Sequence, residues 1–382
     1  MSLLAFALAG ALTPALKLGP ANRIDPDTDY WSSQVLIRDV NGGGRPEVVL
    51  AGIRSADKVY FAGVRVFRWE QGAFQLVGAS DEIEVGFRST MNAAWIAEDT
   101  QASILAIGGS NFLTTVQITL PQVLLDADVI AGIRRPLTEV DLGPPLGKTL
   151  LVGSTSRLYG YHLAVDAPLV EVFQSTRLAE VHEIRVGMSR PGEGPIYHVR
   201  RSGGVHALTR DNFLSGTDSP APLPGVDHSS ARSMLVFDME GNGLEEILIT
   251  TSVGPMRVLT WNGAQYVGHA ADFHPLSAGG GRSSSILDVD NDEQPELVTK
   301  YATSIGLTPV PGDGSLGSEL LVSTTAQSTN SEGLHNMAWG DLDGDGCMDL
   351  VITSRDQDEP TAFFGRSCGA TPSLLRDGFE EP

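Results

Sequence analysis

The sequence predicts an all-β fold, a seven-bladed β-propeller built from repeats of about 50 residues. Three observations predict this fold: a short acidic loop recurs between apolar runs, the copies are evenly spaced, and turn-forming residues are abundant. The chain of 382 residues contains 43 Gly and 22 Pro, a composition typical of many turns and few helices.

The acidic loop is clearest at Asp341–Asp349, which is followed by the apolar run Leu350–Thr353. Its oxygen-bearing side chains occupy positions 1, 3, 5 and 9, with glycine at positions 4 and 6. Calcium takes about 6–8 oxygen ligands in a flexible shell, and alternate residues of a tight turn can supply them. The loop is not an EF-hand, because an EF-hand needs a glutamate at position 12 and flanking helices. Here Ile352 occupies position 12 within a β-rich run, so the pattern indicates strand, metal loop, strand.

Three further copies keep most of these oxygen-bearing side chains. Of three more, the copy at 141 keeps the first aspartate and the apolar residues that frame the loop, and those at 95 and 187 keep the frame alone. The seven units start near residues 39, 95, 141, 187, 238, 288 and 341. A period near 50 with about four short strands per unit is the pattern of propeller blades. The loops that start near 95, 141 and 187 have lost their ligands, so the repeat is partly decayed.

Ring closure divides the chain into three parts. After Asp349 only two more strands are evident, near 350–353 and 361–364, so the last blade lacks an outer strand. The N-terminal segment or residues 370–376 could supply it and remove the open edge. We expect a signal-like or strand-closing segment at 1–20, the propeller at 21–366 and a tail at 367–382.

The loop pattern resembles the FG-GAP/VCBS repeat of integrin alpha chains and of many secreted bacterial proteins. The similarity is most specific at 341–353 and 288–298, fair at 238–250 and weaker at 39–50, where Gly43 occupies position 5. The resemblance implies a propeller in which each loop joins the innermost strand of a blade to the second strand and binds calcium. It implies no particular activity, since function resides in sites grafted on folds.

Calcium is therefore the expected cofactor, with ligands in four blades. The expected ligands are Asp39, Asn41 and Glu47; Asp238, Glu240, Asn242 and Glu246; Asp288, Asp290, Asp292 and Glu296; and Asp341, Asp343, Asp345 and Asp349. The alternative is an acidic turn that stays solvated. That alternative weakens as the number of carboxylates rises, because clustered carboxylates repel one another without a cation.

The net charge of -21 argues against nucleic-acid binding, which needs a basic footprint. The apolar stretch Leu3–Leu16 is too short to span a membrane, and it resembles a signal peptide without a basic start. We expect a secreted, surface-attached or periplasmic monomer. Cys347 and Cys368 either form a disulfide, as in exported proteins, or remain two independent thiols.

A second candidate site follows from ionisable residues that stand just before the innermost strands: Arg88, His182, Arg232, Arg282 and His335. If the metal loops lie on one face of the disk, these residues lie on the other and ring the mouth of the channel. Arginine forks suit a carboxylate, a sulfate or a uronic acid. The alternative is that each arginine only pairs with a neighbouring Asp or Glu.

The function we expect is recognition of a glycan or a cell-surface protein by a calcium-braced propeller. One alternative is a carbohydrate-active enzyme such as a polysaccharide lyase, with a base among Tyr159, Tyr161, His162, Tyr197 and His198. Another is a purely structural module. The sequence contains no zinc motif, nucleophile elbow or phosphate-binding loop, and whether the chain is an enzyme stays open.

Overall fold

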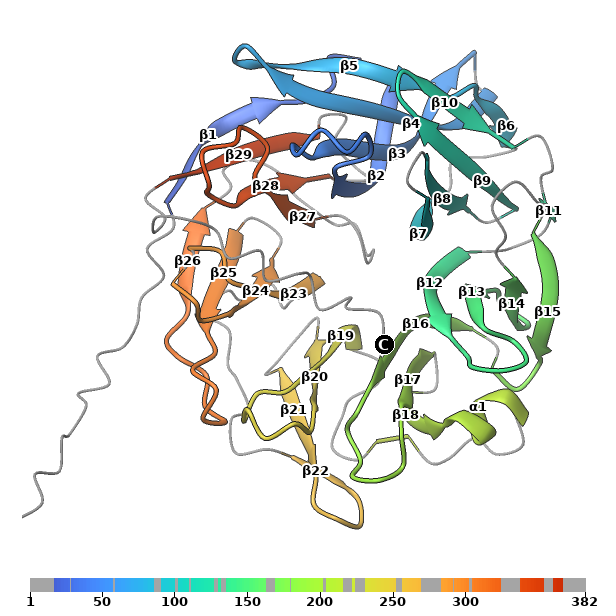
Figure 1. Cartoon of the computed structure of the whole chain (residues 1–382), viewed down its shortest axis with the longest axis vertical. Helices are drawn as coiled ribbons and strands as arrows, with labels where there is room; N and C mark the ends of the chain where they lie inside the picture. Colours follow the sequence, from blue (N-terminus) through green and yellow to red (C-terminus); the bar gives the residue numbers. More distant parts are fainter. Residues whose placement is uncertain are drawn as a thin grey trace, which may run out of the picture.

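Seven antiparallel sheets surround a central axis in the computed structural model of the chain (Figure 1). The predicted seven-bladed, all-β propeller is confirmed. The structure describes residues 17–366 except 28, 58, 86–90, 100–101, 110, 127–129, 132–134, 163–168, 179, 202–203, 216–221, 224–230, 252–255, 269–282, 291, 302–303, 324–336 and 354–359.

The first three blades each contain at least four strands, in order from the axis outward. Blade 1 contains β2 (Tyr30–Arg38), β3 (Glu47–Ala56), β4 (Val59–Glu70) and β5 (Ala73–Ala79), with β6 (Ile83–Val85) added to β4. Blade 2 contains β7 (Asn92–Asp99), β8 (Ala102–Gly108), β9 (Phe112–Thr119) and β10 (Gln122–Leu125), with β11 (Ile130–Ala131) added to β9. Blade 3 contains β12 (Arg135–Asp141), β13 (Lys148–Gly153), β14 (Leu158–His162) and β15 (Val170–Ser175).

The remaining blades complete the ring. Blade 4 contains β16 (Val181–Gly187), β17 (Ile196–Arg201) and β18 (Gly204–Thr209), followed by α1 (Arg210–Ser215). Blade 5 contains β19 (Ala231–Phe237), β20 (Glu246–Thr251), β21 (Arg257–Trp261) and β22 (Tyr266–Gly268). Blade 6 contains β23 (Ser283–Leu287), β24 (Glu296–Lys300), β25 (Ser304–Pro309) and β26 (Leu320–Ser323). Blade 7 contains β27 (Met337–Gly340), β28 (Asp349–Ile352), β29 (Thr361–Arg366) and β1 (Lys17–Arg23).

The N-terminal strand β1 closes the ring, as one of the two predicted alternatives required. It pairs antiparallel with β29, from Lys17 opposite Arg366 to Arg23 opposite Thr361. β1 crosses the expected domain boundary after residue 20, and both residues 1–16 and the other closing candidate, 370–376, lie outside the described residues. With β1 in place, the last blade has no open edge on β29.

Hydrophobic packing between neighbouring blades forms the core. The second strands are buried on both faces; Val48, Val49 and Leu50 of β3 are examples. One core cluster joins residues of blades 1 and 2, and another joins blades 6 and 7. Trp69, Trp95, Trp261 and Trp339 all pack against such clusters, as expected for tryptophans near strands.

Blades 2 and 4 depart from the predicted repeat. In blade 2 the unit is expected to begin near Trp95, but Trp95 lies within β7, which continues to Asp99. In the described part of blade 4, helix α1 follows three strands. Its Phe213 is buried and stacks on Tyr197 with ring centroids 4.5 Å apart. No helix in the part of the chain that the structure describes has the length and apolarity that a membrane crossing requires.

The antiparallel order defines two faces of the disk. The turns that join innermost strands to second strands lie on one face, which we call the loop face. The starts of the innermost strands, the ends of the second strands and the starts of the third strands lie on the other, which we call the opposite face.

Candidate metal loops and a basic face

The four acidic loops share one hydrogen-bond pattern. The carboxylate at position 1 accepts two backbone N–H groups of its own loop; Asp39, for example, accepts those of Gly43 and Gly44 at 2.9 and 2.7 Å. Asp238, Asp288 and Asp341 do the same. The carboxylate at position 9 accepts the N–H at position 2 in every copy. These bonds join Glu47 to Val40, Glu246 to Met239, Glu296 to Val289 and Asp349 to Leu342.

Backbone conformation and packing explain the remaining positions. Position 6 has a positive φ in all four loops, and glycine occupies it in three of them; Glu293, at 69°, is the exception. Glycine adopts this conformation at little cost. Position 2 is an apolar residue that is buried in every copy: Val40, Met239, Val289 and Leu342. These hydrogen bonds, the positive φ at position 6 and the buried position 2 define the common shape of the four loops.

Blades 6 and 7 bring their carboxylates together. Oxygens of Asp288, Asp290 and Glu296 lie within 4.8 Å of one another, and all three residues are buried. Oxygens of Asp341, Asp343 and Asp349 form an equivalent cluster. These are hard oxygen donors, the class that calcium prefers.

In each cluster, burial and the neighbouring carboxylates raise the pKa of the carboxylate at position 9. Burial, with further contributions from Asp290, Asp292 and Asp288, raises the pKa of Glu296 to about 8. Burial, together with Asp343 and Asp341, raises the pKa of Asp349 to about 7. A divalent cation between the oxygens would remove this repulsion, because an opposite charge favours the ionised form.

Blades 1 and 5 differ from this arrangement. In blade 1, the Arg68 guanidinium on β4 bonds to Glu47 Oε1 through Nε at 2.9 Å and Nη2 at 2.6 Å. In blade 5, the side chain of Asn242 donates to Glu240 at 2.7 Å, which turns two expected ligands toward each other. Among the described residues, the structure gathers three or more carboxylates only in blades 6 and 7.

The predicted ring on the opposite face is visible in part. His182 and Arg232 are the second residues of β16 and β19, which are neighbouring innermost strands. His182 is exposed and Arg232 is half-buried. Arg88, Arg282 and His335 lie outside the residues that the structure describes.

A buried carboxylate next to His182 joins blades 4 and 5. Glu183 bonds to Arg185 at 3.1 Å and to Arg200 at 3.1 Å. Its Oε2 also accepts the N–H of Met234 on β19 at 3.1 Å. One buried carboxylate thus contacts two guanidinium groups and a backbone N–H at this end of the blades.

Further arginines surround this position, and we call the set the basic face. Its members lie on the opposite face of blades 3–5, at strand ends or in the connections between strands: Arg157, Arg177, His182, Arg200, Arg201, Arg232 and Arg257. Two of them are in direct contact, because Arg201 on β17 donates to the carbonyl oxygen of Arg177 at 2.7 Å. On this face of these blades, the described acidic residues are Glu180 and Glu183. Among the described residues, this face of blades 3–5 therefore has six arginines and two glutamates, in a chain whose net charge is -21.

Sequence reasoning found only His182 and Arg232 of the basic face. The arginines that it missed stand mostly at the ends of second strands or near the starts of third strands. Once blades are counted, antiparallel alternation places those positions on the same face as the starts of the innermost strands. That signal was available in the sequence, but it required the strand ends to be located.

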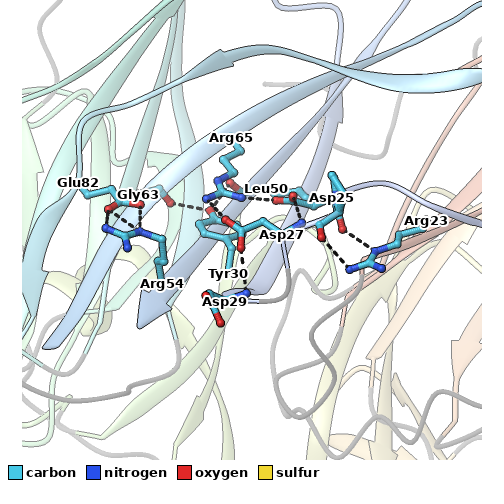
Figure 2. A network of polar contacts seen from close by, with 11 residues as sticks. Arg23, Asp25, Asp27, Asp29, Tyr30, Leu50, Arg54, Gly63, Arg65 and Glu82 are labelled. Carbon is cyan, nitrogen blue, oxygen red and sulfur yellow. Dashed lines mark hydrogen bonds and ion pairs between the residues drawn. The ribbon is translucent and has the colours of Figure 1, made fainter. Parts of the chain in front are cut away.

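A cavity of about 370 Å³, lined by both apolar and charged side chains, opens on the opposite face of blade 1. Figure 2 shows Arg65 between Asp25 and Asp27, each bonded at 2.7 Å, above the ring of Tyr30. The Tyr30 hydroxyl lies 3.0 Å from the carbonyl oxygens of both Leu50 and Gly63, and burial raises its pKa. A tyrosine bound in this way is held as a neutral donor, which does not suit a general base.

The residues considered for a lyase base pack mainly within the blades. Tyr161, Tyr197 and His198 are buried, and Tyr159 stacks on Tyr161. His198 bonds to Ser189, which in turn bonds to Tyr266 at 2.7 Å. Burial, followed by the charge of Arg190, lowers the pKa of His198 to about 3. This is a sealed polar network between blades 4 and 5.

Cys347 at loop position 7 is disulfide-bonded. Its expected partner, Cys368, lies outside the described residues.

Comparison with known proteins supports the fold alone. Two crystal structures of Sqt1 from Chaetomium thermophilum are similar to this chain, each at 12% sequence identity. The first has a TM-score of 0.51 and the match covers 89% of this chain and 85% of that chain; the second has 0.52, 88% and 82%. No family model and no curated protein matches the chain, so the resemblance to the FG-GAP/VCBS family stays a prediction. The chain is a seven-bladed β-propeller.

Proposed function

We propose that this propeller is an exported recognition module that binds an acidic glycan through its basic face. The observation that carries the proposal is the charge distribution: six arginines gather over blades 3–5 on one face of an acidic molecule. Arginine forks match carboxylate and sulfate groups in two-point contacts. A uronic-acid or sulfated oligosaccharide presents such groups in series.

The makeup of the basic face favours a glycan over a protein. The centre of a protein interface is usually apolar and rich in aromatic residues. The exposed large hydrophobic residues among those described are Leu76, Leu124, Val170, Val186, Met188 and Leu321, and none of them belongs to the basic face. A partner with repeated negative charges therefore fits this surface better than a protein that binds through an apolar patch.

We further propose that calcium braces the loop face. The acidic clusters of blades 6 and 7 supply the donor set, with Asp288, Asp290 and Glu296 in one and Asp341, Asp343 and Asp349 in the other. Asp292 would complete the ligands in blade 6 and Asp345 those in blade 7, and Asp238, Glu240, Asn242 and Glu246 would form a third site in blade 5. Bound calcium would hold the loop and cancel the carboxylate repulsion, and it would take no part in recognition. The disulfide of Cys347 supports export, since disulfides persist in oxidising compartments.

The experiment is a binding titration of the calcium-loaded protein with polygalacturonate-type oligosaccharides, beside neutral oligosaccharides of equal length. We expect binding of the acidic series alone, weakened by salt. The double variant Arg177→Ala/Arg257→Ala should lose about tenfold in affinity, about 1.4 kcal/mol. Arg366→Ala is the matched control, because Arg366 is an exposed arginine at the loop-face end of β29. Equal binding of neutral and acidic sugars, or an equal loss in the control, contradicts the proposal.

A further inference from the structure

The four loops share their backbone pattern, yet one of them already contains a cation. The residue on the third strand that faces position 9 follows from the register of each blade. In blades 1, 5 and 7 the last recorded pairs are Val48–Phe67, Ile247–Leu259 and Leu350–Phe363, and position 9 faces the next residue along the third strand. In blade 6 the pair is recorded directly, as Glu296–Pro309. The facing residues are therefore Arg68 in blade 1, Thr260 in blade 5, Pro309 in blade 6 and Phe364 in blade 7.

Arg68 contacts the carboxylate that a metal ion would need. Glu47 is fully buried, and its Oε1 accepts two N–H groups of Arg68 and one from the side chain of Asn41. A second cation at the same oxygen would lie beside the guanidinium and be repelled by it. The expected ligands Asp39, Asn41 and Glu47 thus do not fit calcium as the acidic clusters of blades 6 and 7 do.

The loop that contacts the arginine has fewer acidic residues than the loops without one. The blade 1 loop has Asn41 at position 3 and Gly43 at position 5, whereas blades 6 and 7 have aspartate at both positions. A site with one built-in positive charge needs fewer carboxylates than one that binds a divalent ion. Blade 3 shows a related replacement, because Arg210 of α1 donates to the carbonyl oxygens of Leu142 and Pro144 in the decayed loop.

We propose that Arg68 is the internal substitute for the metal ion in blade 1, so that loop 39–47 holds its shape without calcium. The proposal revises the sequence-based expectation of a metal site at Asp39, Asn41 and Glu47. Only the test that counts bound calcium ions rests on the proposed calcium binding of the other loops.

The first test counts bound calcium by native mass spectrometry in single-loop variants. Asp341→Asn should lower the count by one, and the matched variant Asp39→Asn should leave it unchanged. The double variant Asn41→Asp/Arg68→Gln, which removes the arginine and adds a carboxylate, should raise the count by one. Loss of an ion in Asp39→Asn would overturn the proposal.

The second test needs no calcium. In excess chelator, Arg68→Gln should lower the melting temperature by about 5 °C, because it leaves the buried Glu47 without its charged partner. Thr260→Gln, at the equivalent position of blade 5, is the control and should change it little. An unchanged melting temperature in Arg68→Gln would overturn the proposal even if no loop binds calcium. If Arg68→Gln lowers the melting temperature as expected but Asp341→Asn loses no ion, calcium does not bind in blade 7, and the role proposed for Arg68 still holds.

Discussion

Protonation of the buried His198 opposes folding. This side chain is fully buried on β17, where Ser189 and Tyr266 complete its network and the Arg190 guanidinium lies over the Tyr266 ring. Its folded-state pKa is about 3, against an ordinary value of 6.5. The unfolded chain therefore binds a proton that the folded chain refuses at every pH between these values.

The free energy of unfolding should fall as the pH falls below about 6.5. Once the pH is well below that value, the slope contributed by His198 approaches about 1.4 kcal/mol per pH unit. Urea unfolding at several pH values between 6.5 and 4.5, with calcium saturating, measures it. His198→Gln keeps a polar side chain and should remove this part of the slope, whatever its effect on absolute stability. Parallel curves for the two proteins would contradict the assignment.

At the scale of elements, one arginine fixes the connection that leads from the closing strand β1 into the first blade. Arg65 on β4 bonds to Asp25 and Asp27, and their side chains are 15%, 3% and 37% exposed (Figure 2). The N–H of Ile24 also bonds to the carbonyl of Pro360 in blade 7. The connection is therefore held to both blades that meet at the closure.

Arg65→Met should destabilise the protein by about 3 kcal/mol, because it leaves the Asp25 carboxylate buried without its partner. Chemical denaturation measures the loss. Arg54→Met removes the neighbouring pair with Glu82, whose side chains are 31% and 25% exposed, and should cost about 1 kcal/mol or less. An equal loss of unfolding free energy in both variants would contradict the expectation that the buried Asp25 makes the Arg65 pair the more important one.

These elements also show why the sequence predicted some features and missed others. The loops at Asp288 and Asp341 lie within nine residues, so their pattern can be recognised locally. The pairing of Glu47 with Arg68 depends on the register of β3 and β4, and the choice of β1 as closing strand depends on contact between the two ends of the chain. The spacing of residues in the sequence predicts neither the pairing nor the closing strand. Helix α1 was missed because the period predicted a strand in that place.

At the scale of the whole molecule, calcium should stabilise one sector of the ring. The proposed sites of blades 6 and 7 are adjacent, and blade 7 also contains β1 and so joins the two ends of the chain. At a free calcium concentration of about a hundred times Kd, each ion stabilises the folded state by about 2.7 kcal/mol. Removal of calcium should therefore loosen the closure of the ring before it affects blades 2–4.

Hydrogen exchange at neutral pH, with calcium or with chelator, tests this prediction residue by residue. The amides of Val289 and Leu342 bond to Glu296 and Asp349, so their exchange reports the acidic clusters of blades 6 and 7. Both should exchange at least tenfold faster in chelator, because without the ion the buried carboxylates repel one another or take up protons, and either change weakens the loop. The Val40 amide, bonded to Glu47 in the same way, is the internal control and should not respond, since Arg68 remains in place. A uniform increase over all blades would indicate global destabilisation instead, and unchanged rates at Val289 and Leu342 would show that calcium does not brace this sector.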